Sequence, residues 1–119
     1  MKNLLMKELE DRPDLLVIFD LIEKSSKVID LGCGEGILLN HLRLQKGCSV
    51  CGIEYSQDKI LECVGRGVPV IHGDLDDGLG DYPDDSFDCA VLSQTLQAVK
   101  RPDKLLKDMM RVGKKAYVS

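Results

Sequence analysis

The feature that most limits the fold is a set of glycines at alternate positions, placed where an apolar strand passes into a helix. Residues 27–31 are rich in β-branched side chains and lead directly into Gly32, Gly34 and Gly36. Glycine allows positive φ angles and leaves room for a ligand against the backbone. Residues 37–44 are predicted to form a helix, and the amide groups at a helix start can receive a carboxylate. The pattern predicts a strand, a tight loop and a helix around a ligand.

Strand and helix patterns alternate along the whole chain. We predict strands at residues 27–31, 49–53, 68–71, 87–92 and 116–118, and helices at residues 14–24, 37–44, 57–64 and 102–112. Near-continuous apolar strands that alternate with helices indicate an α/β fold, with a doubly wound, mainly parallel sheet covered on both faces. A chain of 119 residues fits one domain, which we expect to span residues 1–119.

Acidic residues occur at or near the ends of three consecutive strands. Asp30 lies late in an apolar strand, where an ionised carboxylate is costly without a partner, and a cationic ligand group would supply that partner. Glu54 ends the next strand, where an acidic side chain can accept hydrogen bonds from ribose hydroxyls, and Asp74 follows the third strand. Ligands of open α/β sheets bind at the carboxyl ends of the strands, so these acids predict a nucleoside-type site.

The glycine pattern taken alone leaves other interpretations open. Glycines can serve a tight turn for its geometry only. A dinucleotide-binding fingerprint needs a third glycine three residues after the second, and that position is Ile37 here. A phosphate-binding P-loop needs a following Gly-Lys-Ser or Gly-Lys-Thr, which this segment lacks. The acidic strand ends therefore favour the nucleoside-type site.

Asp30 followed by a Gly-x-Gly-x-Gly pattern resembles the motif of class I S-adenosylmethionine-dependent methyltransferases. Several stretches together are similar to the methionine-biosynthesis protein MetW family: DLGCGEG at 30–36, DLDDGL at 74–79, QAV at 97–99, PDKLL at 102–106 and MRVG at 110–113. The resemblance covers residues 27–119. It implies a Rossmann-like methyltransferase fold, and because the family pattern continues past the fifth strand, we expect a sheet truncated there.

The resemblance also implies a ligand, S-adenosylmethionine or S-adenosylhomocysteine. Asp30 and the glycine loop would face its methionine part, Glu54 its ribose, and Asp74 with Leu75 its adenine. The expected cofactor-binding residues are Asp30, Gly32, Cys33, Gly34, Gly36, Glu54, Tyr55, Asp74 and Leu75. No catalytic residue is assigned, because the polar residues near the predicted site form no recognisable catalytic unit: His41, His72, Ser93, Gln94 and Gln97.

Members of the MetW family are associated with homoserine O-acetyltransferase in methionine synthesis. The resemblance therefore implies that acetyltransferase as a partner. Two functions stay open at this point. The chain is an accessory protein that binds S-adenosylmethionine and acts with the acetyltransferase, or it is an enzyme that methylates a small molecule not identified by the sequence.

Composition and charge exclude several other classes of protein. A formal net charge of -4 argues against a general nucleic-acid binder, which needs a basic excess to neutralise phosphates. The apolar run at residues 15–19 is far too short to span a bilayer, and acidic residues before it argue against a signal peptide. Five cysteines without such a signal are expected to be reduced and mostly buried. We expect a cytoplasmic protein with no membrane partner.

Three further patterns are interpreted as structural. Cys48 and Cys51 have the spacing of half a zinc site, but no second close pair supplies the remaining ligands, so we predict no metal. The aspartates at residues 74–88 lack the ligand spacing of a calcium-binding loop and are expected to be solvated. A basic stripe at helical spacing, along and just beyond helix 102–112, is interpreted as an ordinary solvated face: Lys104, Lys107, Arg111 and Lys114. The strand at residues 116–118 is expected at an exposed sheet edge, which would favour self-association.

Overall fold

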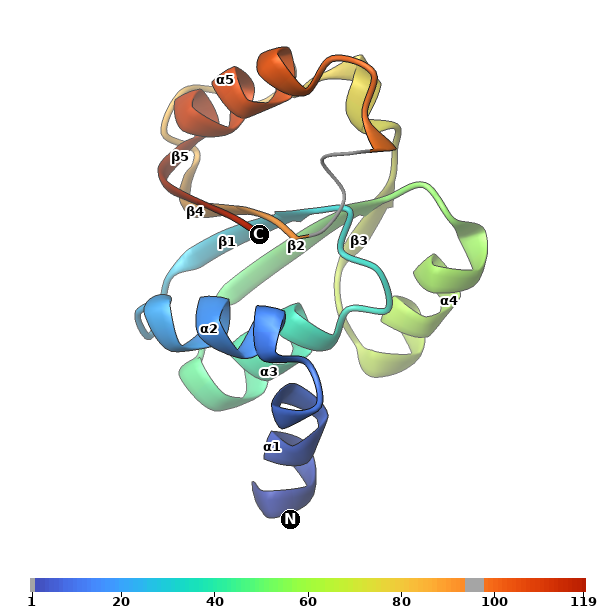
Figure 1. Ribbon diagram of the computed structural model, residues 1–119, viewed down its shortest axis with the longest axis vertical. Helices are drawn as coiled ribbons and strands as arrows, with labels where there is room; N and C mark the ends of the chain where they lie inside the picture. The colour runs from blue at the N-terminus through green and yellow to red at the C-terminus, as the bar shows by residue number, and fades with distance from the viewer. Residues whose placement is uncertain (1, 94–97) are drawn as a thin grey trace.

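The computed structural model describes residues 2–93 and 98–119. Its strands are β1 (Lys27–Leu31), β2 (Ser49–Glu54), β3 (Val70–His72), β4 (Phe87–Leu92) and β5 (Gly113–Val118). They form one sheet in the order β3-β2-β1-β4-β5, and every neighbouring pair is parallel (Figure 1). The order reverses direction between β1 and β4, so the predicted doubly wound parallel sheet is confirmed. Open sheets of this kind bind ligands beside that switch point.

Helices cover both faces of the sheet. They are α1 (Lys2–Glu10), α2 (Pro13–Leu21), α3 (Ile37–Lys46), α4 (Gln57–Arg66) and α5 (Pro102–Val112), with a short 3-10 helix η1 (Leu75–Asp77). Figure 1 shows α2 and α3 on one face of the sheet and α5 on the other, with α1 packed beyond α2 and α3. The sheet therefore lies between two apolar layers.

The side chains of β1 alternate between these two layers. Val28 packs in the cluster of α2 and α3, whereas Ile29 and Leu31 pack in the cluster of α5. Asp30 has the same parity as Val28 along the strand, so it belongs to the α2–α3 face. This alternation places a carboxylate inside the protein, at the end of the central strand.

Some predicted element bounds are wrong. The structure ends α2 at Leu21 instead of residue 24, and Lys46 donates hydrogen bonds to the carbonyls of Phe19 and Ile22 at that end. Helix α1 was not predicted at all. Strand β3 starts at Val70, two residues later than predicted, because Pro69 has no N–H for a ladder and only accepts a bond from Gly52. The cysteines are free and all but Cys51 are buried, as expected.

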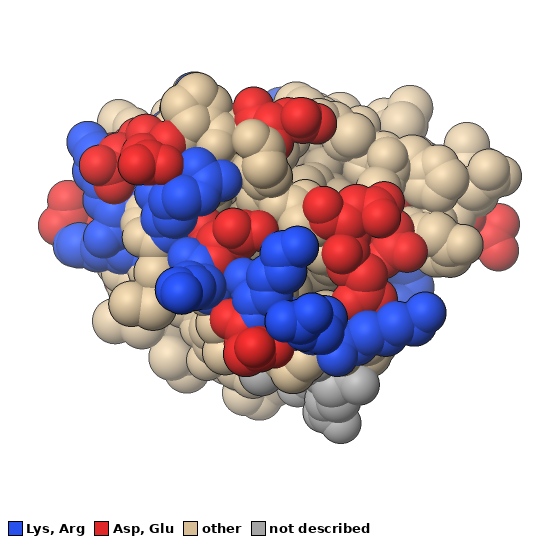
Figure 2. Space-filling model, turned by 90° about the horizontal axis from the view of Figure 1, so that it is seen from above, with Lys and Arg blue, Asp and Glu red and all other residues tan. Residues whose placement is uncertain are grey.

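The aspartate-rich loop is held by one residue of the predicted basic stripe. Arg111 donates from Nη1 to the carbonyl of Tyr82 (2.8 Å) and to Asp84 (2.9 Å), and from Nη2 to the carbonyl of Leu79 (2.9 Å). The prediction of an ordinary solvated face is therefore wrong for Arg111, although Lys104 and Lys107 are exposed. Figure 2, which looks onto the α5 side of the molecule, shows acidic and basic side chains interleaved there.

Strand β5 lies at one edge of the sheet in the part of the chain that the structure describes, as expected. It pairs with β4 along one side, from Gly113 opposite Phe87 to Val118 opposite Leu92. Self-association through its other side stays a prediction. Within residues 2–93 and 98–119, the helices are too short or too polar to cross a membrane.

Candidate functional site

A cavity of about 640 Å³ opens at the carboxyl ends of β1, β2 and β3. Its wall is formed by the loops that follow these strands, by the start of α2 and by residues just after β4. All of the predicted site residues except Gly36 line it: Asp30, Gly32, Cys33, Gly34, Glu54, Tyr55, Asp74 and Leu75. The fold thus brings together side chains that are up to 45 residues apart in the sequence.

The glycine loop turns sharply after β1 because its glycines take left-handed backbone angles. Gly34 has φ +60°, and a side chain added there would meet nothing within 4 Å. Gly36 has φ +82° and is the N-cap of α3, and a Cβ there would lie 3.0 Å from the sulfur of Cys63. Gly34 therefore leaves open space beside the backbone, whereas Gly36 lies behind the cavity and allows close packing of α4 against the loop.

Glu54, at the end of β2, ties the glycine loop to the start of α4. Its Oε1 accepts from the N–H of Gly34 (2.8 Å), and its Oε2 accepts from the N–H groups of Tyr55 (3.0 Å) and Ser56 (2.9 Å). A carboxylate has about four lone-pair sites, so these three bonds leave it capacity for a ligand hydroxyl. Backbone amides thus fix this side chain at the rim of the cavity.

Asp30 is the buried acid of the site. It is 3% exposed, and its Oδ1 has no hydrogen-bond partner among the described residues. Burial, with a smaller contribution from the negative charge of Glu54, raises the pKa of the Asp30 carboxyl to about 7. A cationic group in the cavity would favour the ionised form and give this carboxylate a partner.

The residues after β3 contribute a polar turn and an apolar side chain. Asp74 accepts a hydrogen bond from the N–H of Asp76 (2.9 Å) and so caps η1. Asp76 in turn accepts from the N–H of Lys100 (2.8 Å). Leu75 packs against the α5-side core and also lines the cavity. The turn is therefore held by hydrogen bonds, and it offers an apolar surface beside a carboxylate.

The cavity also contains residues that sequence patterns did not indicate. Arg12 and Leu15 reach it from the start of α2, and Lys59 reaches it from α4. Their positions depend on helix packing, for which the local sequence carries no signal. Acidic side chains outnumber these cations: Asp30, Glu35, Glu54, Asp74 and Asp76 line the cavity, against Arg12 and Lys59. The balance favours a ligand that carries positive charge.

The two histidines lie outside the cavity. His41 is fully buried within α3 and bonds Glu8 and Gln45. His72 is exposed on β3, where its ring lies 5.6 Å from that of Tyr55. Neither histidine is placed to act on a bound ligand.

The segment after β4 supplies one hydroxyl to the cavity. Ser93 lines it, and its hydroxyl donates to Asp14 at 3.3 Å. Gln94 and Gln97, which also follow β4, lie outside the described residues. No catalytic unit is assigned from the described side chains.

A family model described as "Methionine biosynthesis protein MetW" matches residues 12–119. The bifunctional methionine biosynthesis protein MetXA/MetW of Rhodopirellula baltica is 39% identical over 110 residues, which cover 86% of this chain and 18% of that protein. Norajmaline N-methyltransferase of Rauvolfia serpentina is 28% identical over 102 residues, covering 79% of this chain and 34% of that enzyme. The chain therefore spans about a third of the length of these relatives or less.

Solved structures show the same fold. An S-adenosylmethionine-dependent methyltransferase from Mesorhizobium loti superposes with a TM-score of 0.72 at 27% identity, covering 85% of this chain and 47% of that one. The similarity includes the parallel sheet and the helices on both of its faces. The Rossmann-like class I methyltransferase fold expected from the sequence is confirmed.

Proposed function

Because this chain belongs to the methionine biosynthesis protein MetW family, we propose that it binds S-adenosylmethionine or S-adenosylhomocysteine in the cavity at the carboxyl ends of β1, β2 and β3. The observation that carries the proposal is the buried Asp30 carboxylate, which lines the cavity and has no partner for Oδ1 among the described residues. A buried acid without a partner raises the free energy of the folded protein, and a cationic ligand removes that cost.

The ligand's chemistry fits the side chains around it. S-adenosylmethionine carries a sulfonium and an ammonium group against one carboxylate, so its net charge complements an acidic cavity. Its ammonium group would bind Asp30, and its ribose diol would donate to Glu54, which keeps capacity for a further hydrogen bond. The adenine would lie along Leu75 and Ile53, beside the Asp74 turn. The open space at Gly34 would admit the ligand against the backbone.

We further propose that the protein acts with homoserine O-acetyltransferase in methionine synthesis. The support is family membership, together with the Rhodopirellula baltica relative, whose name joins MetXA and MetW in one bifunctional protein. A fusion of two activities implies that they work side by side, and we take MetXA as the acetyltransferase part. Such a role would place this chain in the cytoplasm. Ligand-dependent binding of the acetyltransferase would require that the free and bound states differ in affinity for the ligand.

The second candidate function is methylation of a small molecule. It is supported by the similarity to norajmaline N-methyltransferase and by the reach of the cavity to Ser93 beyond β4. Methyl transfer from a sulfonium mainly requires an aligned nucleophile, so the lack of an assigned base does not oppose it. S-adenosylmethionine would donate its methyl group, and this chain's residues would orient it and the small-molecule acceptor.

One experiment separates these functions. The protein is mixed with homoserine O-acetyltransferase from the same cell, with and without S-adenosylmethionine, and co-purification, acetyl transfer and methyl transfer are measured together. Association with a change in acetyl transfer supports the accessory function. Turnover of a methyl acceptor, with neither association nor a change in acetyl transfer, would contradict it and establish the enzyme.

A further inference from the structure

We propose that Glu8 is a positioning residue for the ligand cavity, because it holds α1 onto α3 and α4 and thereby couples the docking of α1 to ligand binding. This inference deepens the proposed function and depends on it for the identity of the ligand. Helix α1 precedes the part of the chain that the MetW family model matches. Its contacts are therefore a property of this chain that family membership does not describe.

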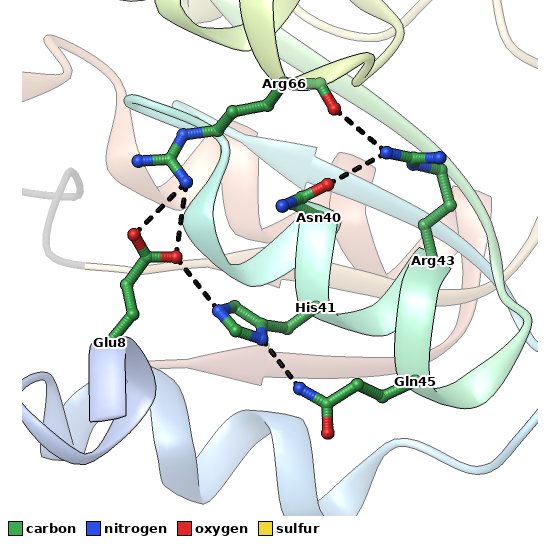
Figure 3. A network of polar contacts seen from close by, with 6 residues as sticks. All are labelled: Glu8, Asn40, His41, Arg43, Gln45 and Arg66. Carbon is green, nitrogen blue, oxygen red and sulfur yellow. Dashed lines mark hydrogen bonds and ion pairs between the residues drawn. The ribbon is translucent and has the colours of Figure 1, made fainter. Parts of the chain in front are cut away.

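The carboxylate of Glu8 bonds two other helices at once. Its Oε1 lies 2.9 Å from Nε2 of His41 on α3, and both of its oxygens lie 3.2 Å from Nη1 of Arg66, the last residue of α4 (Figure 3). The other ring nitrogen of His41 accepts from the side-chain amide of Gln45 at 2.7 Å. Nε2 therefore carries the proton and donates it to Glu8. The bonds to Glu8 are charge-assisted and partly buried, which makes them stronger than exposed pairs.

Helix α1 needs these contacts to stay folded. It spans only nine residues, and isolated helices shorter than about 12 residues are marginal in water. Leu9 is fully buried and packs in the core of α2 and α3. Among the described side chains of α1, Glu8 supplies the polar contacts to α3 and α4, and Leu9 supplies a fully buried apolar contact. Loss of the Glu8 bonds would therefore weaken the attachment of α1.

The position of α1 is transmitted directly to the cavity wall. The N–H of Arg12 donates to the carbonyl of Leu9 (2.9 Å), and the N–H of Leu15 donates to the carbonyl of Arg12 (3.0 Å). These bonds connect α1 to α2 without a flexible linker. Arg12 and Leu15 both line the cavity, and Arg12 is one of the two cations, with Lys59, in its predominantly acidic lining. Displacement of α1 would therefore move this wall.

The other side of the network also leads to the ligand site. The carbonyl of Arg66 accepts from Nη2 of Arg43 on α3 (2.9 Å), which joins α3 to the end of α4 (Figure 3). From α4, the thiol of Cys63 donates to the carbonyl of Gly34 in the glycine loop (3.1 Å). Glu8 is thus connected through α4 to the loop that follows β1, and through α1 to the part of the cavity wall that α2 forms.

Coupling of this kind is reciprocal, which makes it measurable. Glu8→Ala is compared with Glu8→Gln, which keeps an oxygen for His41, and with Glu10→Ala, an exposed glutamate of the same helix. Binding of S-adenosylhomocysteine is measured by calorimetry, and hydrogen exchange of residues 2–10 is measured with and without that ligand. We expect Glu8→Ala to weaken binding about fivefold or more, Glu8→Gln to lie between it and the unaltered chain, and Glu10→Ala to change nothing.

In the unaltered chain, the ligand should slow exchange of α1 by a similar factor, and this protection should disappear in Glu8→Ala. A short helix with few packing contacts exchanges by local opening, so a merely global stabilisation by the ligand would not slow it. Unchanged exchange of α1 on ligand binding, with equal affinity of Glu8→Ala and the unaltered chain, would overturn the coupling alone. Absence of binding by the unaltered chain would overturn the proposed ligand and this inference together.

Discussion

The carboxylate of Glu54 accepts a hydrogen bond from the amide of Gly34 across 2.8 Å, so the end of β2 holds the loop that follows β1. Neighbouring parallel strands place the two residues at the same sheet edge, although 20 residues separate them in the sequence. The same carboxylate is the group proposed to bind the ligand's ribose. One side chain would therefore hold both the loop and the proposed ligand.

Substitution of Glu54 by Gln should weaken ligand binding strongly. A hydrogen bond to a charged group contributes about 1.5 to 3 kcal/mol, so S-adenosylhomocysteine should bind roughly tenfold more weakly or worse. Glu62→Gln, an exposed glutamate on α4, is the matched control and should bind normally. Calorimetry at one pH gives both affinities. Equal affinities for the Glu54 variant and the unaltered chain would remove Glu54 from the site.

Substitution of Asp30 by Asn should change how stability depends on pH. The folded-state pKa of Asp30 is about 7 against 3.8 when exposed, so the folded protein holds a proton that the unfolded chain releases between these values. The contribution of the protonated Asp30 carboxyl to the free energy of unfolding is fully present below pH 3.8 and is lost as the pH rises through 7. At about 1.4 kcal/mol per pKa unit, the free energy of unfolding of Asp30→Asn should rise, relative to that of the unaltered chain, by up to about 4 kcal/mol between low pH and pH 8. Urea unfolding at pH 5 and pH 8 measures this, and parallel pH profiles for the two proteins would contradict it.

Part of the site could be predicted from the sequence, because two of its acids stand at recognisable strand ends. Asp30 lies next to the last residue of its apolar strand and Glu54 ends the neighbouring strand, so parallel pairing brings both side chains to one edge of the sheet. Arg12 and Lys59 could not be predicted, because helix packing brings them to the cavity and no motif marks them. The Glu8 contacts were missed for the same reason.

The two glycines of the loop should respond differently to alanine. A Cβ at Gly36 would lie 3.0 Å from the sulfur of Cys63, whereas a Cβ at Gly34 would meet nothing within 4 Å. Both residues have positive φ, which costs a non-glycine residue about 1 to 2 kcal/mol. Gly34→Ala should lose about that much stability, and Gly36→Ala should lose more because packing is disturbed as well. Denaturant unfolding measures the stability of both variants. A larger loss of stability for Gly34→Ala than for Gly36→Ala would contradict this prediction.

Arg111 should prove necessary for the order of the aspartate-rich loop. Arg111→Ala removes three hydrogen bonds to Leu79, Tyr82 and Asp84 and leaves two carbonyls without this donor. The Leu79 carbonyl keeps its bond from the N–H of Tyr82 (3.0 Å), so the loss falls on the Tyr82 carbonyl and on the pair with Asp84. At about 1 to 3 kcal/mol for a carbonyl left without a partner, the free energy of unfolding should fall by roughly that amount. Lys107→Ala, on the exposed face of the same helix, should have little effect. Hydrogen exchange of residues 78–86 should quicken in the first variant only, and equal exchange in both would contradict the assignment.

The most direct test of the central claim is calorimetric titration of the unaltered chain with S-adenosylmethionine and with S-adenosylhomocysteine. We expect one molecule of either ligand to bind, and the thermal midpoint to rise with ligand concentration because only the folded state binds. Asp30→Asn should reduce the affinity for both ligands, since the amide carries no charge to pair with the ligand's ammonium group. No heat of binding and no thermal shift with either ligand at millimolar concentration would contradict the claim that this cavity is an adenosyl-ligand site.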